Sequence, residues 1–203
     1  MTLQSGGLLR AALVAGAGLA LVAMPLTADA GVVYSNVSIS GSLGSGGTFV
    51  TGPNDIDFNF VSAIVGDAQP ARSGNIIITY IASSDDGGSF SRMDLSVLGA
   101  TLGSGTVVVN EVIEDLITPG IIASFGAVYT DSSGHSLPQT AEIQLSRSST
   151  KVKVKKTFVL VAPETANLDV ASVSLVEQRL VPSPGSAALI GLSGLIAVRR
   201  RRA

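Results

Sequence analysis

Residues 54–60 read Asn-Asp-Ile-Asp-Phe-Asn-Phe, and in this stretch apolar and polar side chains alternate strictly. Ile56, Phe58 and Phe60 form the apolar set, and polar residues lie between them. Successive side chains of a β-strand point to opposite faces of its sheet. A period of two therefore predicts a strand with one face in the core and one face in water.

The same alternation extends through much of the chain between residues 31 and 180. It recurs in three further segments, residues 92–97, 142–145 and 151–155. Residues 76–81 and 107–109 are more uniformly apolar, which predicts strands nearer the centre of a sheet. Only residues 107–117 leave the choice between helix and strand open.

Clusters of Gly, Pro, Ser, Asn and Asp separate these apolar stretches at short intervals. They lie at residues 41–47, 52–55, 83–88, 102–105, 118–120 and 131–134. Roughly ten short strands at this spacing are typical of an antiparallel sandwich. We therefore predict an all-β fold, a single antiparallel β-sandwich or jelly-roll-like domain over residues 31–180.

Residues 166–180 are expected to form the last strand of this domain. The alternation assigns one face to Leu168, Val170, Ser172 and Ser174. It assigns the opposite face to Asp169, Ala171, Val173 and Leu175.

The composition excludes several kinds of site. The chain has 203 residues with no Cys and a single His. Without Cys there is no disulfide scaffold, thiol nucleophile or Cys-ligated metal, and one His cannot supply a multi-His metal site. Some 150 residues between the termini are enough to bury a core without disulfides.

The N-terminal segment has the layout of a secretory signal peptide. Arg10 precedes the uncharged apolar residues 11–26, and the small residues Ala28 and Ala30 follow. A basic start, an apolar segment and a small-x-small site are the three parts of such a signal. We predict a signal peptide at residues 1–30 that is cleaved after Ala30, with an uncleaved anchor as the alternative.

The C-terminal segment, residues 181–203, also has three parts. A Pro/Gly break precedes the uncharged residues 187–198. The chain then carries four consecutive basic residues, Arg199, Arg200, Arg201 and Arg202. A helix of 12 residues is roughly 18 Å long, so it can span a ~30 Å hydrocarbon core only where the bilayer thins or the Arg side chains snorkel. Because positive flanks stay cytoplasmic, this short transmembrane helix would place the β-domain outside the inner membrane.

This order of break, short apolar helix and terminal Arg cluster resembles the bacterial PEP-CTERM sorting signal. The break matches at Val181, Pro182, Pro184 and Gly185, whereas Ser183 stands where that family usually has Glu. The resemblance implies that an exosortase, a membrane-embedded sorting enzyme, recognises and removes the segment. It also implies export and association with extracellular polysaccharide in a biofilm matrix. A plain C-terminal membrane anchor is the alternative.

The charge is distributed unevenly between the domain and the two terminal segments. The whole chain has a net charge of −2, but residues 31–180 hold 8 basic and 14 acidic residues, a net charge of −6. An acidic exported domain disfavours nucleic acid as a partner.

Candidate catalytic and metal-binding residues are few. Asp85 and Asp86 lie in a Ser/Gly-rich loop, and His135 lies between turn residues without a nucleophile motif nearby. Asn54, Asp55, Asp57 and Asn59 resemble the start of a calcium loop but lack its later ligands. Glu111, Glu114 and Asp115 are interpreted as a polar strand face or a loop. We predict no catalytic site, no metal and no cofactor.

One candidate ligand surface remains, on a basic strand. Lys151, Lys153 and Lys155 share one face at a spacing of roughly 7 Å, and Lys156 follows them. They could contact an anionic polysaccharide, but we favour an edge strand that Lys protects from aggregation. Sugar stacking would need exposed aromatic residues, and we expect most of Tyr34, Tyr80 and Tyr129, together with all six Phe, to pack in the core.

Together these features predict an exported, non-enzymatic protein of the bacterial cell surface or extracellular matrix. Its expected partners are the export machinery, an exosortase-type enzyme and, before processing, the inner membrane. The alternatives are a carbohydrate-binding module for extracellular polysaccharide and a hydrolase, which would need carboxylates that converge in a cleft.

Overall fold

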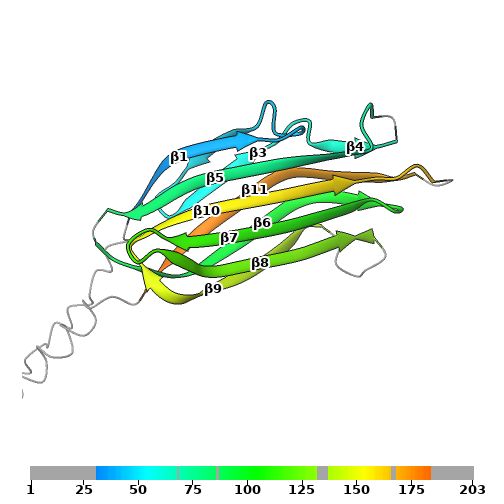
Figure 1. Ribbon diagram of the computed structural model, residues 1–203. Helices are drawn as coiled ribbons and strands as arrows, with labels where there is room; N and C mark the ends of the chain where they lie inside the picture. Colours follow the sequence, from blue (N-terminus) through cyan, green and yellow to red (C-terminus); the bar gives the residue numbers. More distant parts are fainter. Residues whose placement is uncertain (1–30, 68, 86, 132–136, 166–167, 184–203) are drawn as a thin grey trace, which may run out of the picture.

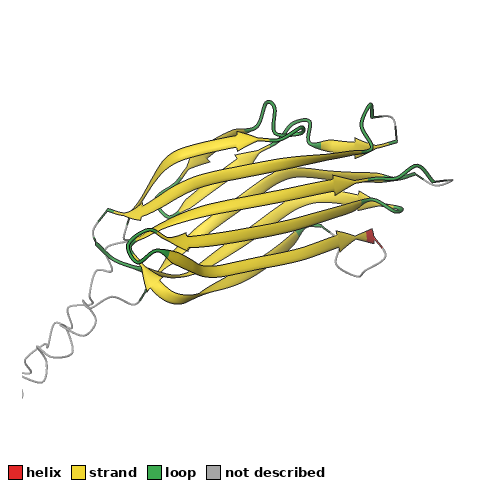
Figure 2. Cartoon of the chain, viewed as in Figure 1, coloured by secondary structure: helices red, strands yellow, loops and turns green. Residues whose placement is uncertain are grey.

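The computed structural model describes residues 31–67, 69–85, 87–131, 137–165 and 168–183. Within these residues the chain forms eleven β-strands and no α-helix. Figures 1 and 2 show the strands, and the short red segment in Figure 2 is a 3₁₀ turn at Asp131. No helix in the described part of the chain is long and apolar enough to cross a membrane. The predicted signal peptide with Ala28 and Ala30 lies outside the described residues, as do His135 and residues 184–203.

The strands form two antiparallel sheets that face each other (Figure 1). Sheet A has the order β1 (Val32–Ser40), β5 (Ser73–Ser84), β10 (Lys151–Val161), β7 (Thr106–Asp115), β8 (Gly120–Thr130). Sheet B has the order β2 (Thr48–Thr51), β3 (Asp55–Asn59), β11 (Val170–Pro182), β6 (Phe90–Leu102), β9 (Gln139–Ser149), and the short β4 (Ile64–Gly66) also pairs with β11. The predicted antiparallel β-sandwich is confirmed.

The core fills the space between the two sheets. The predicted alternation is confirmed in β3, where Ile56 and Phe58 are fully buried and Asp55 and Asp57 lie on the outer face. It is confirmed equally in β6, whose inward set is Met93, Leu95 and Val97. The ambiguous residues 107–117 form strand β7 and the turn after it, because alternate valines there face the core.

The last strand differs from its prediction in position and in facing. β11 begins at Val170 and extends to Pro182, so it includes the first two residues of the predicted sorting segment. Its pairing with β6 shifts between Val173 and Leu175, which is the position of a β-bulge. The extra residue turns Leu175 outward and Val176 into the core, so the predicted facing of Leu175 was wrong.

Two buried carboxylates connect the loops at the two ends of the sandwich. At one end Asp169 accepts hydrogen bonds from Ser104 N (2.7 Å) and Thr165 N (2.9 Å). The hydroxyl groups of Thr165 and Ser104, with these backbone amides, lower the pKa of Asp169 to about 2. Asp169 therefore stays ionised and holds three connections together.

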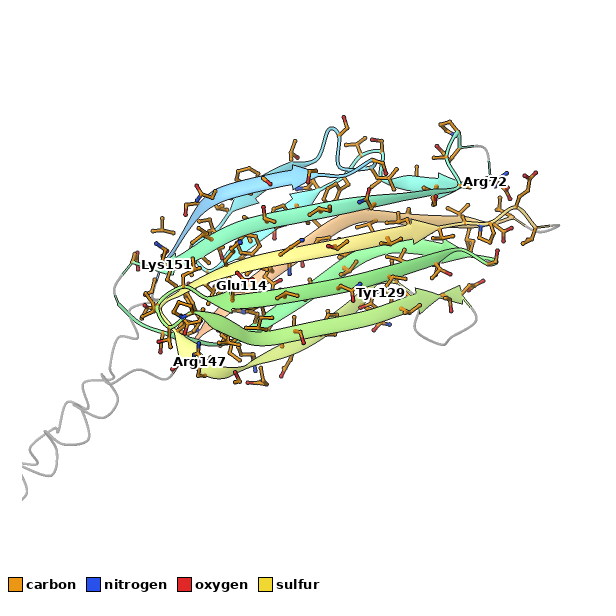
Figure 3. All side chains as sticks on the ribbon, in the orientation of Figure 1. Arg72, Glu114, Tyr129, Arg147 and Lys151 are labelled. Atoms are coloured by element: carbon orange, nitrogen blue, oxygen red, sulfur yellow. The ribbon has the colours of Figure 1, made fainter. Side chains whose placement is uncertain are left out.

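At the other end Asp115 performs the same role. Its carboxylate accepts bonds from Ser149 Oγ (2.7 Å), Ile117 N (2.8 Å) and Arg147 Nε (2.9 Å). These donors, the Ser149 hydroxyl first, hold the pKa of Asp115 well below its usual range. Arg147 marks this end and Arg72 the opposite one (Figure 3).

Candidate functional site

The basic stripe lies on the outer face of sheet A. Lys151, Lys153 and Lys155 are exposed there, and Lys153 Nζ lies 3.7 Å from a carboxylate oxygen of Glu114 on β7. Lys151 and Glu114 are labelled in Figure 3. The favoured interpretation as an edge strand was wrong, because β10 lies in the centre of sheet A between β5 and β7. The stripe is therefore an accessible surface on a central strand.

Lys156 does not belong to this stripe. It faces the core together with Val152, Val154, Phe158 and Leu160, and it is fully buried. The period of two already contained this signal, since all five residues have the same parity along the strand. A Lys in the middle of an apolar strand face is unusual because Lys is almost never fully buried unless it is paired.

The partners of Lys156 come from both sheets. Its Nζ is in contact with Oε2 of Glu111, the residue directly opposite on β7. It also donates a hydrogen bond to Oε1 of Gln178, which reaches across from β11 in sheet B. Glu111 is 1% exposed and Gln178 0%. We call Lys156, Glu111 and Gln178 the buried triad.

Burial dominates the electrostatics of the buried triad. It lowers the pKa of Lys156, and the neighbouring Glu111 carboxylate offsets only part of this effect. Burial also raises the pKa of Tyr80 well above its usual value, with the Glu111 carboxylate as the second cause. Within the buried triad, Gln178 Nε2 and both carboxylate oxygens of Glu111 have no hydrogen-bond partner among the described residues, although Glu111 Oε2 is in ion-pair contact with Lys156 Nζ.

A second feature is a hollow of about 360 Å³ on the outer face of sheet B. Polar side chains from β3, β11, β6 and β9 surround it: Asp55, Asp57, Asp94, Ser96, Thr140, Glu177 and Arg179. Strand register brings them together, because Asp57 pairs with Glu177 and Glu177 with Ser96 across neighbouring strands. We call this feature the acidic hollow.

Like charges oppose one another in the acidic hollow. Burial raises the pKa of Asp57, and the carboxylates of Asp55 and Glu177 raise it further. Arg92 Nε lies 3.0 Å from Asp94 and offsets one of the negative charges. Carboxylates in this arrangement can accept hydrogen bonds from the hydroxyl groups of a ligand.

Aromatic side chains do not contribute to the acidic hollow. Tyr80 and Tyr129 are buried, and Tyr34 is half-buried with its ring 5.9 Å from that of Tyr80. The expectation that all six Phe pack in the core was wrong for Phe49, which is 45% exposed on β2 at the margin of the sandwich. No aromatic residue is among the described residues that line the hollow.

The structure separates the acids that lie close together in the sequence. Glu111 and Asp115 point into the molecule and are buried, whereas Glu114 points outward toward Lys153. The interpretation of all three as one polar face or loop was therefore wrong, since the strand period places Glu114 opposite the other two. No group of three or more acidic or His side chains among the described residues is arranged to hold a metal ion.

Comparisons with known proteins do not assign this chain to a family. No family model matches the chain, and no curated protein matches it. Among solved structures, TmCBM61 in complex with β-1,4-galactotriose superimposes with a TM-score of 0.43 at 14% identity, over 73% of this chain and 90% of the other. A carbohydrate-binding module from the β-sandwich superfamily gives 0.30 at 11%, over 76% of this chain and 57% of the other.

The family 11 carbohydrate-binding module of Clostridium thermocellum, in complex with a mixed-linked tetrasaccharide, gives a TM-score of 0.24 at 11% identity, over 75% of this chain and 86% of the other. Similarity at these levels does not identify a ligand.

Proposed function

We propose that this chain is an exported, non-enzymatic protein of the bacterial cell surface or extracellular matrix, and that an exosortase-type enzyme removes its C-terminal segment. The two terminal segments motivate the proposal. Before processing, the short apolar helix and its Arg cluster would hold the β-sandwich at the outer side of the inner membrane.

One structural observation supports this proposal: the described chain starts and ends at the same end of the sandwich. Asp85 N donates a hydrogen bond to Gly31 O (3.0 Å), and Ser183 N donates one to Ser89 O (2.6 Å). Both ends of the described part of the chain, at Gly31 and Ser183, are thus hydrogen-bonded to the connection between β5 and β6 (Figure 1). A domain attached at one end can be released by cleavage without loss of its core.

The position of C-terminal cleavage is a testable consequence. Val181 and Pro182 are paired with β6, and Ser183 N donates a hydrogen bond to Ser89 O. The backbone up to Ser183 is therefore already engaged in contacts within the sandwich. We expect the mature C-terminus to lie at or beyond Ser183, because an enzyme needs a free backbone to bind. Mass spectrometry of the protein purified from its own cell envelope measures both mature ends.

A matched pair of variants supports the same test. Replacement of Arg199 to Arg202 by Ser should leave the chain unprocessed, whereas Lys151→Ser should be processed as the wild type. Full-length wild-type protein that persists in the inner membrane beside its native sorting machinery would contradict the proposal. A mature C-terminus inside β11 would contradict the predicted cleavage position.

A second candidate function is the binding of extracellular polysaccharide. The acidic hollow favours it, because four carboxylates and the Arg179 guanidinium converge on one face without a metal arrangement among the described residues. Such a set can exchange hydrogen bonds with sugar hydroxyls. A neutral polysaccharide suits this face, since its negative charge repels anionic chains.

Affinity gels that contain neutral or anionic polysaccharide test this candidate. We expect retention by a neutral polysaccharide, weakened about tenfold in the Asp57→Asn, Glu177→Gln double variant, which corresponds to a loss of roughly 1.4 kcal/mol. Lys153→Gln on the opposite face is the control and should bind normally. If no neutral polysaccharide retards the protein, this candidate function is wrong, and retention that depends only on Lys153 would assign binding to the basic stripe.

A further inference from the structure

The buried triad is unexplained by either proposed function. The side chains of Lys156, Glu111 and Gln178 are buried between the two sheets and do not belong to the basic stripe, although Gln178 is also among the residues around the acidic hollow. Burial of charge and of an amide is costly unless every polar atom is satisfied. Here the amide nitrogen of Gln178 and one oxygen of Glu111 have no partner among the described residues. Stabilisation of the fold alone therefore does not account for this buried group of polar side chains.

The buried triad places three chemical groups in one site: the amine of Lys156 as a nucleophile, the carboxylate of Glu111 as a base and the side-chain amide of Gln178 as an electrophile. The amine Nζ of Lys156 touches the carbonyl oxygen of Gln178, so it also lies beside the carbonyl carbon Cδ. The same nitrogen touches the carboxylate of Glu111. A primary amine that touches both a primary amide and a carboxylate has the groups that an acyl transfer requires.

We propose that Lys156 and Gln178 form an intramolecular amide cross-link after folding, with Glu111 as the catalytic residue that transfers the proton. This inference concerns the core of the domain and does not rest on export or on polysaccharide binding.

The reaction balances without any co-reactant. Nζ of Lys156 attacks Cδ of Gln178, and Glu111 accepts the proton that Nζ loses. Glu111 then delivers that proton to Nε2, the Cδ–Nε2 bond breaks, and ammonia leaves. A primary amine and a primary amide have become a secondary amide and ammonia, with no oxidation or reduction.

The surroundings favour this reaction in three ways. Burial lowers the pKa of Lys156, which increases its share of neutral, nucleophilic amine. The fold holds the reacting groups in place, and such positioning is worth effective concentrations of about 10⁵–10⁸ M. The dry core excludes water that would compete for Cδ, since all three side chains are buried.

The product would connect the two sheets covalently. Lys156 lies on β10 in sheet A and Gln178 on β11 in sheet B, and the two are 22 residues apart in sequence. A cross-link between the central strands opposes separation of the sheets. In a chain without Cys it takes the place that a disulfide between the sheets holds in other sandwiches.

Peptide mapping of the folded, full chain in detergent tests the proposal directly. Trypsin does not cleave after an acylated Lys, and residues 157–178 contain no Lys or Arg. We therefore expect a tryptic peptide of residues 156–179 that lacks the mass of one ammonia and contains a closed ring. A single cleavage inside the ring, after Glu164 or after Glu177, should open it without releasing a fragment.

Variants separate the cross-link from other sources of ammonia loss. Glu111→Gln and Lys156→Met should each restore the mass calculated from the sequence, whereas Lys155→Met should keep the deficit. A wild-type chain that is folded by circular dichroism but yields the free peptide 157–179 overturns the proposal, whether or not the variants fold. Loss of water between Lys156 and Glu111 in place of ammonia also overturns it.

Discussion

Replacement of Glu111 by alanine is expected to lower the free energy of unfolding by about 3–5 kcal/mol, the effect of removing one partner of a buried ion pair. The change leaves the Lys156 amine in the core without its carboxylate. It also removes the group that the proposed cross-link needs, and loss of the cross-link lowers the free energy of unfolding further. Urea unfolding followed by circular dichroism measures the difference.

Glu114→Ala is the matched control, because Glu114 lies on the same strand and pairs with Lys153 at the surface. That pair is 3.7 Å apart and both side chains are about half exposed, so its loss should cost roughly 0–1 kcal/mol. Equal destabilisation by the two changes would show that Glu111 is not a buried partner of Lys156. Lys156→Met combined with Glu111→Leu should recover much of the loss, since apolar side chains can replace a buried pair.

Phe58→Ala is expected to lower the free energy of unfolding by about 3–5 kcal/mol, the range for truncation of a buried aromatic residue. Phe58 is fully buried, and its ring lies 5.9 Å from Tyr80 of the other sheet. Truncation therefore opens a cavity where the sheets meet. Thermal or urea unfolding of the purified variant measures the effect.

Phe49→Ala provides the control for this second change. Its ring lies 6.3 Å from Phe58, but the side chain is 45% exposed on the edge strand β2. About half of the transfer free energy of a Phe side chain is at stake, so the expected loss is roughly 1 kcal/mol. If Phe49→Ala destabilises the chain as much as Phe58→Ala, the assignment of Phe58 to the central core is wrong.

Most of the strand pattern was predictable from sequence because a half-buried strand has a period of two. Ile56 and Phe58 face the core as their alternation with Asp55 and Asp57 predicted. The facing of Leu175 was not predictable, because one extra residue at a bulge inverts every position after it. A bulge depends on how a strand pairs with its neighbour, so the apolar pattern of one strand alone does not reveal it.

The sequence predicts part of the buried triad, whereas it does not predict the acidic hollow. Period two alone puts Lys156 beside Val154 and Phe158, and puts Glu111 beside Val109 and Ile113, so both buried charges could have been found. That they meet each other was not predictable, because it depends on which strands are neighbours and on their register. The acidic hollow depends likewise on the pairing of β3 with β11.

The sequence by itself determined the all-β class and the inward faces of most strands. It also predicts two terminal export segments. These follow from local periodicity and from the order of charge and apolar residues along the chain. Only the tertiary structure decided that β10 is a central strand, and that Lys156, Glu111 and Gln178 share one site. The physical reason is that strand order arises from long-range pairing, which brings together residues that no local pattern connects.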